Sequence, residues 1–311
     1  MNYAVALISL LVSIHFVCFA VPNDKNSVTN HHKIELLKFS LLENKQVIFV
    51  GDSLTRYQYL NLVHALHTNS WRPSQDPAIE VETPWSNWKN FHLGTSQRLG
   101  CQEYCDCYRN INAGDPMLFK ENRHYYDQKS NISIRMFLWL PPHNINVNLV
   151  PNSTIMNKRC DFSLPAWMDA FNYEPTAQMS TSDIVNFLTT VVKPLDTDLL
   201  ILNQGFWEYP TFRNPNIAMT AFNTIATVSK RVIWKTTTAR CDREVFTPID
   251  DQTFLKMIEL NGRIELFDAY NITKFYASNT ENCWDGKHFF SHVYTKLNIA
   301  LFEQLFPDLT Q

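Results

Sequence analysis

The chain has 311 residues, of which 45% are hydrophobic and 18% charged, enough apolar material for one large domain or two small ones. Its 27 basic and 30 acidic residues give a formal charge of −3, unlike the basic surface of a protein that coats nucleic acid. No two of its seven glycines lie five residues apart, which excludes a Walker A phosphate loop, and no three fit the dinucleotide-binding fingerprint. The H-E-x-x-H and C-x-x-C zinc signatures are also absent.

The N-terminal 20 residues form an apolar segment that ends in the small residues Cys18 and Ala20, a spacing that suits signal peptidase. We therefore expect a cleaved signal peptide over 1–20. A retained type II membrane anchor, as in Golgi proteins, and a buried helix are the alternatives. The first two interpretations place the rest of the chain in the secretory lumen or outside the cell. Residues 21–44 are expected to be a polar lead-in to a single domain over 45–311.

The cysteines and glycosylation motifs agree with a secreted protein. Outside the leader there are six cysteines, an even number that predicts three disulfides: Cys101, Cys105, Cys107, Cys160, Cys241 and Cys283. N-glycosylation motifs occur at Asn131, Asn152 and Asn271. A metal site in the C-x-x-x-C-x-C segment is the less favoured interpretation, because no histidine lies at ligand spacing in the neighbouring sequence. No metal or other cofactor is expected.

Strand-like and helix-like segments alternate along the chain. Val47–Val50 predicts a strand buried on both faces, and a helix follows the Gly51-Asp52 turn from Ser53 onward. Further strands are predicted at Asn131–Leu140, Asp198–Leu202, Arg231–Thr236 and Arg263–Ala269, and helices at Ser182–Val192, Asn216–Lys230, Asp250–Leu260 and Phe289–Phe306. This order predicts an α/β fold with a parallel sheet between helix layers. We expect an irregular, disulfide-stapled insertion over 69–128, with one or two short strands.

Three reactive side chains are predicted to meet at the C-terminal edge of this sheet, where open parallel sheets bind ligands. Ser53 directly follows the first strand at the start of a helix, which exposes its hydroxyl and aims the helix N-terminus at it. A serine in such a turn is, by itself, more often only a helix N-cap. Asp285 and His288 lie three residues apart in the loop before the last helix, at the same edge. In this arrangement His288 is the general base for Ser53, and Asp285 fixes the imidazole tautomer.

An oxyanion hole is predicted from Ser53, Asn203 and Gly205, because an amide side chain and backbone N–H groups are the donors that an oxyanion needs. Asn203 and Gly205 follow the third predicted strand, and a plain turn that closes the strand is the alternative for both. Trp207 is a candidate platform for an acyl group or a sugar. The alternative bases are His124, His143 and His292.

Several blocks of the sequence resemble those of a known protein family. Gly51-Asp52-Ser53-Leu54, with Arg56 and Gln58, resembles the first block of the GDSL/SGNH hydrolase superfamily. With its D-x-x-H block, the chain is most similar to the PC-esterase and trichome-birefringence-like branch. The segments 203–207 and 235–237 also resemble that branch, and the resemblance runs from about Lys45 to Phe306. It implies a three-layer α/β/α sandwich around a five-stranded, mostly parallel, flavodoxin-like sheet.

Two features depart from the superfamily pattern. The usual third block, G-x-N-D, is absent, because Asn203 stands in an N-x-G sequence. The glycine of the second block is either Gly94 or Gly100, with no spacing to choose between them.

The resemblance implies acyl transfer to or from carbohydrate hydroxyls, with Ser53 as nucleophile, His288 as base and Asp285 as its orienter. We therefore expect a secretory-pathway serine acyl-enzyme, either an O-acetyltransferase or an acetylesterase, that acts on O-acetyl groups of a glycan. The expected substrate contacts are Arg56, Trp207 and Trp284. The expected partners are the glycan and, for a transferase, an acetyl donor, and the chain is expected to be a monomer. The alternative is a non-catalytic extracellular glycan-binding protein on the same fold.

The positions of the cysteines predict their pairing. Cys241 follows the fourth predicted strand and Cys283 precedes the D-x-x-H loop, so both lie at one sheet edge and are expected to form a disulfide. A bridge between Cys105 and Cys107 is expected to strain the backbone. Two pairings of the other four cysteines then remain, Cys101–Cys105 with Cys107–Cys160, or Cys101–Cys107 with Cys105–Cys160. The second is preferred because its short loop is less cramped.

Overall fold

The computed structural model describes residues 39–71, 88–109, 119–139, 184–206, 215–242 and 252–307. The strands are β1 Gln46–Gly51, β2 Glu103–Arg109, β3 Phe119–Asp127, β4 Ile132–Leu138, β5 Leu199–Leu202, β6 Arg231–Lys235 and β7 Ile264–Phe267. The α-helices are α2 Ser53–Thr68, α4 Trp88–Arg98, α5 Ile184–Phe187, α7 Pro215–Ile225, α8 Gln252–Asn261, α9 Ala269–Ala277 and α10 Ser291–Leu305. Shorter helical turns are η1 Phe39–Leu42, η2 Gly100–Gln102, η5 Leu188–Val192, η6 Lys193–Leu195 and η7 Thr280–Asn282.

The seven strands form one sheet in the order β2-β3-β4-β1-β5-β6-β7. From β4 to β7 the neighbouring strands are parallel, whereas β2 and β3 pair antiparallel at one edge. The predicted α/β fold with a parallel sheet is therefore confirmed, and the five predicted strands are its parallel members. In chain order these five lie 2-1-3-4-5 across the sheet, a common order for doubly wound sheets.

The described parts of residues 69–128 contain the two strands and a disulfide that were expected, but they are regular structure and not an irregular insertion. This stretch contributes helix α4 and the strands β2 and β3, of seven and nine residues, which extend the main sheet. The sheet therefore has seven strands where five were expected. Charged residues within these strands hide their pattern in the sequence, because Arg123 of β3 is buried and pairs with both Glu103 and Glu121, which are also buried.

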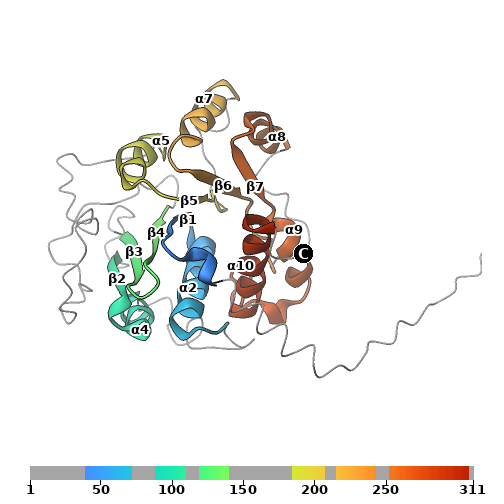
Figure 1. Cartoon of the computed structure of the whole chain (residues 1–311). Coiled ribbons are helices and arrows are strands. Elements are labelled where there is room, and N and C mark those ends of the chain that lie inside the picture. Colours follow the sequence, from blue (N-terminus) through green and yellow to red (C-terminus); the bar gives the residue numbers. More distant parts are fainter. Residues whose placement is uncertain are drawn as a thin grey trace, which may run out of the picture.

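Alternate residues of the central strands enter two separate cores. Val47 and Phe49 of β1 pack in the core that includes α2 and α10, whereas Ile48 and Val50 pack in the core that includes α5, α7 and α8. Figure 1 shows these helices on opposite sides of the sheet. The two-sided burial explains why β1 is a continuous apolar run, since both faces of a parallel strand are covered.

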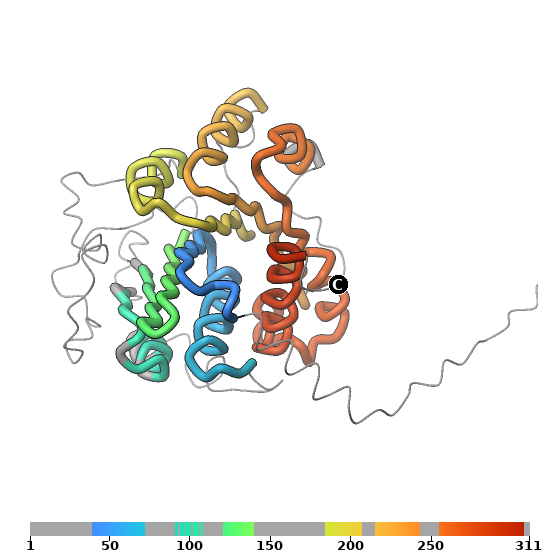
Figure 2. Tube along the Cα trace, viewed as in Figure 1, coloured from blue at the N-terminus to red at the C-terminus, as the bar shows by residue number. Residues whose placement is uncertain are grey.

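Helix α2 lies beside helix α10, although the two come from opposite ends of the described chain (Figure 2). Buried amides join them: Asn61 Nδ2 donates to the carbonyl of Ser291 at 3.1 Å, and Asn298 Nδ2 donates to the carbonyl of Gln58 at 3.1 Å. The loop that precedes α10 is thereby held close to the turn that begins α2.

Some predicted boundaries differ from the structure. Helix α7 ends at Ile225, five residues before the predicted Lys230. Beyond it, Thr227 Oγ1 donates to the carbonyl of Thr224 and Ser229 Oγ donates to the carbonyl of Thr197. Helix α9 was not predicted; Asp268 caps it by accepting from the backbone N–H of Asn271. Ser182 and the predicted leader over 1–20 lie outside the described residues.

No helix among the described residues is both long and apolar enough to cross a membrane. The described residues contain two disulfides, Cys105–Cys107 and Cys241–Cys283, which are compatible with a secreted or lumenal protein.

The turn after β5 requires a glycine. Gly205 has a φ of +70°, and a Cβ built there would collide with Asp52, whose own Cβ would be 2.8 Å away. Both the left-handed backbone and the close approach of Asp52 therefore exclude a side chain at this position. Gly94, in the middle of α4, has open space around its α-carbon.

We expect Gly205→Ala to lower the free energy of unfolding by about 1–3 kcal/mol, from backbone strain and the displacement of Asp52. Gly94→Ala is the matched control and is expected to raise stability by about 0.5–1 kcal/mol, because alanine favours a helix interior more than glycine does. Urea denaturation of the two variants measures the difference. Equal stability of the two variants would contradict this account of the turn.

Candidate active site

Ser53 occupies the first position of helix α2, immediately beyond the end of β1. The N-cap of this helix is Asp52, not Ser53: its Oδ1 accepts from the backbone N–H groups of Leu54 at 3.0 Å and Thr55 at 3.4 Å. Because Asp52 does the capping, the Ser53 hydroxyl is left for another partner. The alternative prediction, that Ser53 serves only as the N-cap of the helix, is therefore wrong.

That partner is His288. The Nε2 of His288 lies 2.7 Å from the Ser53 Oγ, and its Nδ1 lies 2.7 Å from Oδ2 of Asp285. An ionised carboxylate only accepts hydrogen bonds, so the neutral imidazole donates its Nδ1–H to Asp285 and presents Nε2 as the acceptor for the serine O–H. The structure thus brings the three predicted side chains together in one hydrogen-bonded chain.

Two aromatic rings hold the His288 ring in this orientation. Trp284 stacks on it with ring centroids 5.1 Å apart, and Tyr57 contacts it edge-on at 5.2 Å. Tyr57 stands four residues after Ser53 on α2, so it lies on the same helix face. Trp284 was predicted as a substrate contact; its ring is partly buried, and this stacking gives it a positioning role beside the base.

The hydrogen bonds to Asp285 fix the loop as well as the ring. Its Oδ1 accepts from the backbone N–H of His288 at 2.8 Å and of Lys287 at 3.1 Å. Burial alone would raise the pKa of Asp285, but the hydrogen bonds from His288 outweigh it and the pKa lies below its ordinary value. Burial lowers the pKa of His288, and Asp285 offsets this only in part. Near neutral pH the pair is therefore a carboxylate and a neutral imidazole.

The loop that carries Asp285 and His288 is covalently linked to the chain segment after β6. The predicted disulfide between Cys241 and Cys283 is present, with Cα atoms 6.4 Å apart. The carbonyl of Gly286 also accepts from the backbone N–H groups of Cys241 at 2.9 Å and Asp242 at 3.1 Å. These links anchor the loop to the chain segment after β6.

Two backbone N–H groups were predicted to donate to a substrate oxyanion, those of Ser53 and Gly205. Ser53 N–H, in the first turn of α2, has no acceptor within the helix. Neither it nor the N–H of Gly205 donates to any hydrogen bond found among the described residues. Both lie beyond the C-terminal ends of neighbouring parallel strands, β1 and β5, and their role as oxyanion donors stays a prediction.

The side chain of Asn203 has another role. It is fully buried, its Nδ2 donates to the carbonyl of Lys235 at 2.8 Å, and its Oδ1 accepts from Thr55 Oγ1 at 3.1 Å. These bonds join the ends of β5 and β6 to helix α2. The predicted oxyanion role of the Asn203 amide therefore does not agree with its hydrogen bonds.

A buried cation lies beneath the first turn of α2. Lys235, the last residue of β6, is fully buried, and its Nζ donates to Gln58 Oε1 at 3.0 Å and lies 3.4 Å from Thr55 Oγ1. Burial lowers the pKa of Lys235 to about 8, while the negative charge of Asp52 opposes the shift. Lys235 thus supports the turn that carries Ser53. No such role was predicted for Lys235, because its partners come from another element.

Arg56, a predicted substrate contact, lies in the core instead. Its side chain is 1% exposed, and its Nη1 binds Glu121 Oε2 at 3.1 Å. Its guanidinium also lies 4.7 Å from the ring centroid of Tyr57. Arg56 therefore packs against Tyr57 inside the core. Its predicted contact with substrate is wrong, because the side chain is too deeply buried.

The pairing predicted for Cys105 and Cys107 is also wrong. The two form a disulfide with each other, with Cα atoms 5.3 Å apart, inside the usual range for a bridge. Residues two apart in a strand point to the same face, so β2 brings both sulfur atoms together. The expected strain does not prevent the bridge. Cys160 lies outside the described residues, as does the side chain of Cys101.

The remaining predicted residues lie away from Ser53 or outside the described chain. His124 is buried in β3 with Nε2 2.9 Å from Ser133 Oγ, and His292 lies 2.9 Å from Asn282 Oδ1. Gly94 lies within α4, and Gly100 precedes β2 at the edge where β1 begins. Asn131 and Asn271 are exposed. Trp207, His143 and Asn152 lie outside the described residues.

Fold and site together define an α/β protein with a serine–histidine–carboxylate chain at the carboxyl edge of its sheet. Neither a scan against protein-family models nor a search of curated proteins found a match to this chain.

We expect Cys241→Ala/Cys283→Ala to lower the free energy of unfolding by about 2–5 kcal/mol, because this bridge closes a long loop. The two cysteines are 42 residues apart in sequence, against 2 for Cys105 and Cys107. Cys105→Ala/Cys107→Ala is thus the matched control, with a smaller entropic effect. Urea denaturation measures both, and non-reducing peptide mapping checks the link. Free thiols at Cys241 and Cys283 would contradict the assignment.

Proposed function

We propose that the protein is a serine acyl-enzyme of the secretory pathway that acts on O-acetyl groups of carbohydrate. The observation that carries the proposal is the 2.7 Å contact between His288 Nε2 and Ser53 Oγ at the N-terminus of a helix. A serine so paired, with its base held by a carboxylate, is the arrangement that activates a hydroxyl as a nucleophile.

In the first half of the reaction Ser53 Oγ attacks the carbonyl carbon of the acetyl ester, and His288 Nε2 takes the hydroxyl proton. The imidazolium that forms is stabilised by Asp285, whose carboxylate stays ionised because its pKa is low. The backbone N–H groups of Ser53 and Gly205 are the proposed donors to the oxyanion, aided by the N-terminal dipole of α2. As the intermediate collapses, His288 returns its proton to the leaving alcohol.

In the second half water or a sugar hydroxyl attacks the acetyl-serine, and His288 takes its proton. As the bond between the acetyl carbon and Ser53 Oγ breaks, His288 returns this proton to Ser53 Oγ. Water as the attacking group gives an acetylesterase, and a sugar hydroxyl gives an O-acetyltransferase. The same three side chains serve both reactions, so the acceptor alone distinguishes them.

The carbohydrate class rests on the resemblance of three short blocks to the PC-esterase and trichome-birefringence-like branch. These blocks are the segment from Gly51, the N-x-G segment after β5, and Asp285 with His288. The order of the parallel strands also supports this proposal, since it is the flavodoxin-like order that the resemblance implies. The disulfides and the apolar N-terminal segment support a lumenal or secreted location.

We expect Ser53→Ala and His288→Ala each to reduce p-nitrophenyl acetate turnover about 10³-fold or more, because each removes a member of the triad. Asp285→Asn is expected to cost less than His288→Ala, since the amide still contacts the ring. His292→Gln, which changes a histidine one helical turn further on, is the control. Labelling by a fluorophosphonate at Ser53 measures the same chemistry without a substrate. Normal turnover by folded Ser53→Ala would refute the nucleophile.

We expect activity to rise with pH along a single titration whose midpoint lies below about 6.5, the ordinary pKa of histidine. The sign follows from the base: only neutral His288 accepts the serine proton, and burial lowers its pKa. Asp285→Asn is expected to move the midpoint lower still, because Asp285 favours the protonated ring. A pH–rate profile that is flat from about pH 5 to 8 would argue against this assignment. So would a profile for Asp285→Asn, measured down to about pH 4, whose midpoint equals that of the unaltered protein.

A further inference from the structure

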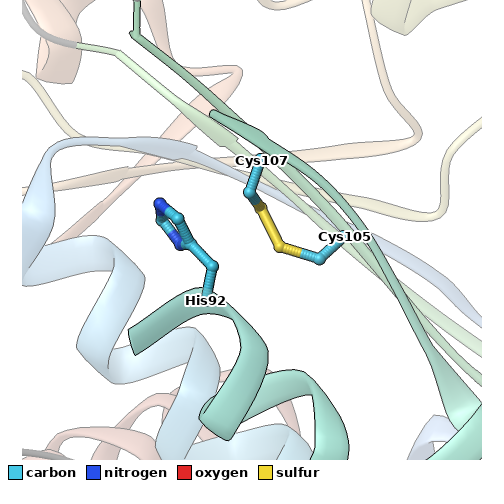
Figure 3. Close-up of side chains that lie close together, drawn as sticks. All are labelled: His92, Cys105 and Cys107. Atoms are coloured by element: carbon cyan, nitrogen blue, oxygen red, sulfur yellow. A yellow bond between two sulfur atoms is a disulfide. The ribbon is translucent and has the colours of Figure 1, made fainter. Parts of the chain in front are cut away.

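The face of β2 that packs on α4 holds a second cluster of reactive side chains. Cys105 and Cys107 are fully buried and form a small core of their own. His92, on α4, is also buried, at 2% exposure. Figure 3 shows its ring rising from the helix beside the disulfide. One ring nitrogen and the two sulfur atoms lie within 4.8 Å of one another.

We propose that these three side chains form a zinc site when the disulfide is reduced. Two thiolates and an imidazole are ligands that Zn²⁺ prefers, and three protein ligands leave a fourth position for water or another donor. The sequence argued against a metal here because no histidine stood at ligand spacing. The fold supplies one from a separate helix.

The chemistry balances with an external dithiol as reductant. The dithiol gives two electrons and two protons to the Cys105–Cys107 bond and becomes a disulfide itself. Cys105 and Cys107 are then thiols, and each loses its proton as a Zn–S bond forms. The oxidised protein has no thiolate at this position, so the site exists in only one of the two redox states.

The surroundings are arranged to accept such a site. A buried network next to His92 contains two arginines and two glutamates, Arg56, Arg123, Glu103 and Glu121. Its formal charges cancel, and Zn²⁺ with two thiolates and a neutral imidazole adds no further net charge. The site therefore avoids the cost of an unbalanced buried charge.

The same network contacts the His92 ring. Its Nδ1 lies 3.3 Å from Arg123 Nη2 and 3.8 Å from Glu121 Oε1. Arg123 can only donate, so the Nδ1 of a neutral His92 ring accepts from its Nη2, while the Glu121 carboxylate lies beyond hydrogen-bond distance of the ring. Coordination of Zn²⁺ through Nε2 therefore requires the ring proton to move to Nδ1 and Arg123 to turn away from it.

The proposal does not depend on the acyl-transfer function, and its first test needs no variant. The full chain is reduced with a phosphine, divided, and alkylated with iodoacetamide with and without one equivalent of Zn²⁺. Tandem mass spectrometry then follows each cysteine. We expect Zn²⁺ to slow alkylation of Cys105 and Cys107 about tenfold or more, and to leave Cys241 and Cys283 unaffected. Equal rates with and without Zn²⁺ at Cys105 and Cys107 would overturn the proposal.

Variants give the second test, with Co²⁺ as a spectroscopic probe of thiolate ligation. The reduced chain is expected to bind Co²⁺ with a sulfur charge-transfer band that Cys105→Ser/Cys107→Ser abolishes. His92→Gln is expected to weaken binding about tenfold or more. Cys241→Ser/Cys283→Ser, which removes the same number of thiols, is expected to keep the band. A band that survives in Cys105→Ser/Cys107→Ser, or equal affinity in His92→Gln, would overturn the assignment, and circular dichroism verifies that each variant is folded.

Discussion

The carboxylate of Asp52 joins the chain segments on which the candidate active site depends. Its Oδ1 caps helix α2, and its Oδ2 accepts from the backbone N–H of Phe206 at 3.4 Å, beyond the end of β5. Gly205 allows the β5 turn to approach so closely because it has no side chain. The buried ammonium group of Lys235 balances the negative charge of Asp52. The Asp52 carboxylate thus links the ends of β1 and β5, and this link positions Ser53.

The base has equally firm support, of a different kind. The ring of His288 lies between Trp284 and Tyr57, and Tyr57 in turn lies against the guanidinium of Arg56. Arg56 belongs to the buried ion network that reaches His92 and β2 through Glu121. The candidate active site and the proposed zinc site are therefore both supported by this buried ion network, although they lie on different elements. Rigid support of this kind keeps catalytic groups in geometry without the cost of reorganisation.

The sequence predicted what is local and periodic. The five parallel strands are apolar runs, and Asp285 and His288 lie within one short loop, so both could be recognised from spacing. The strands β2 and β3 could not, because Glu103, Glu121 and Arg123 make them look solvated until their ion pairs form. The same limit applies to Asn203, whose amide looked like a free donor although its acceptor is the carbonyl of Lys235 on the next strand. Cys105 and Cys107 were misassigned because the strand geometry that joins them was not foreseen.

The contact between Ser53 and His288 spans 235 residues of sequence. Contacts of such long range form late, since loop closure must precede them. During synthesis the first strand and its helix therefore emerge with a serine that has no base, and the pair is completed only after the D-x-x-H loop has left the ribosome. On the proposed mechanism, a nascent or truncated chain carries the nucleophile in an inert form, and chemical competence arrives together with the finished fold.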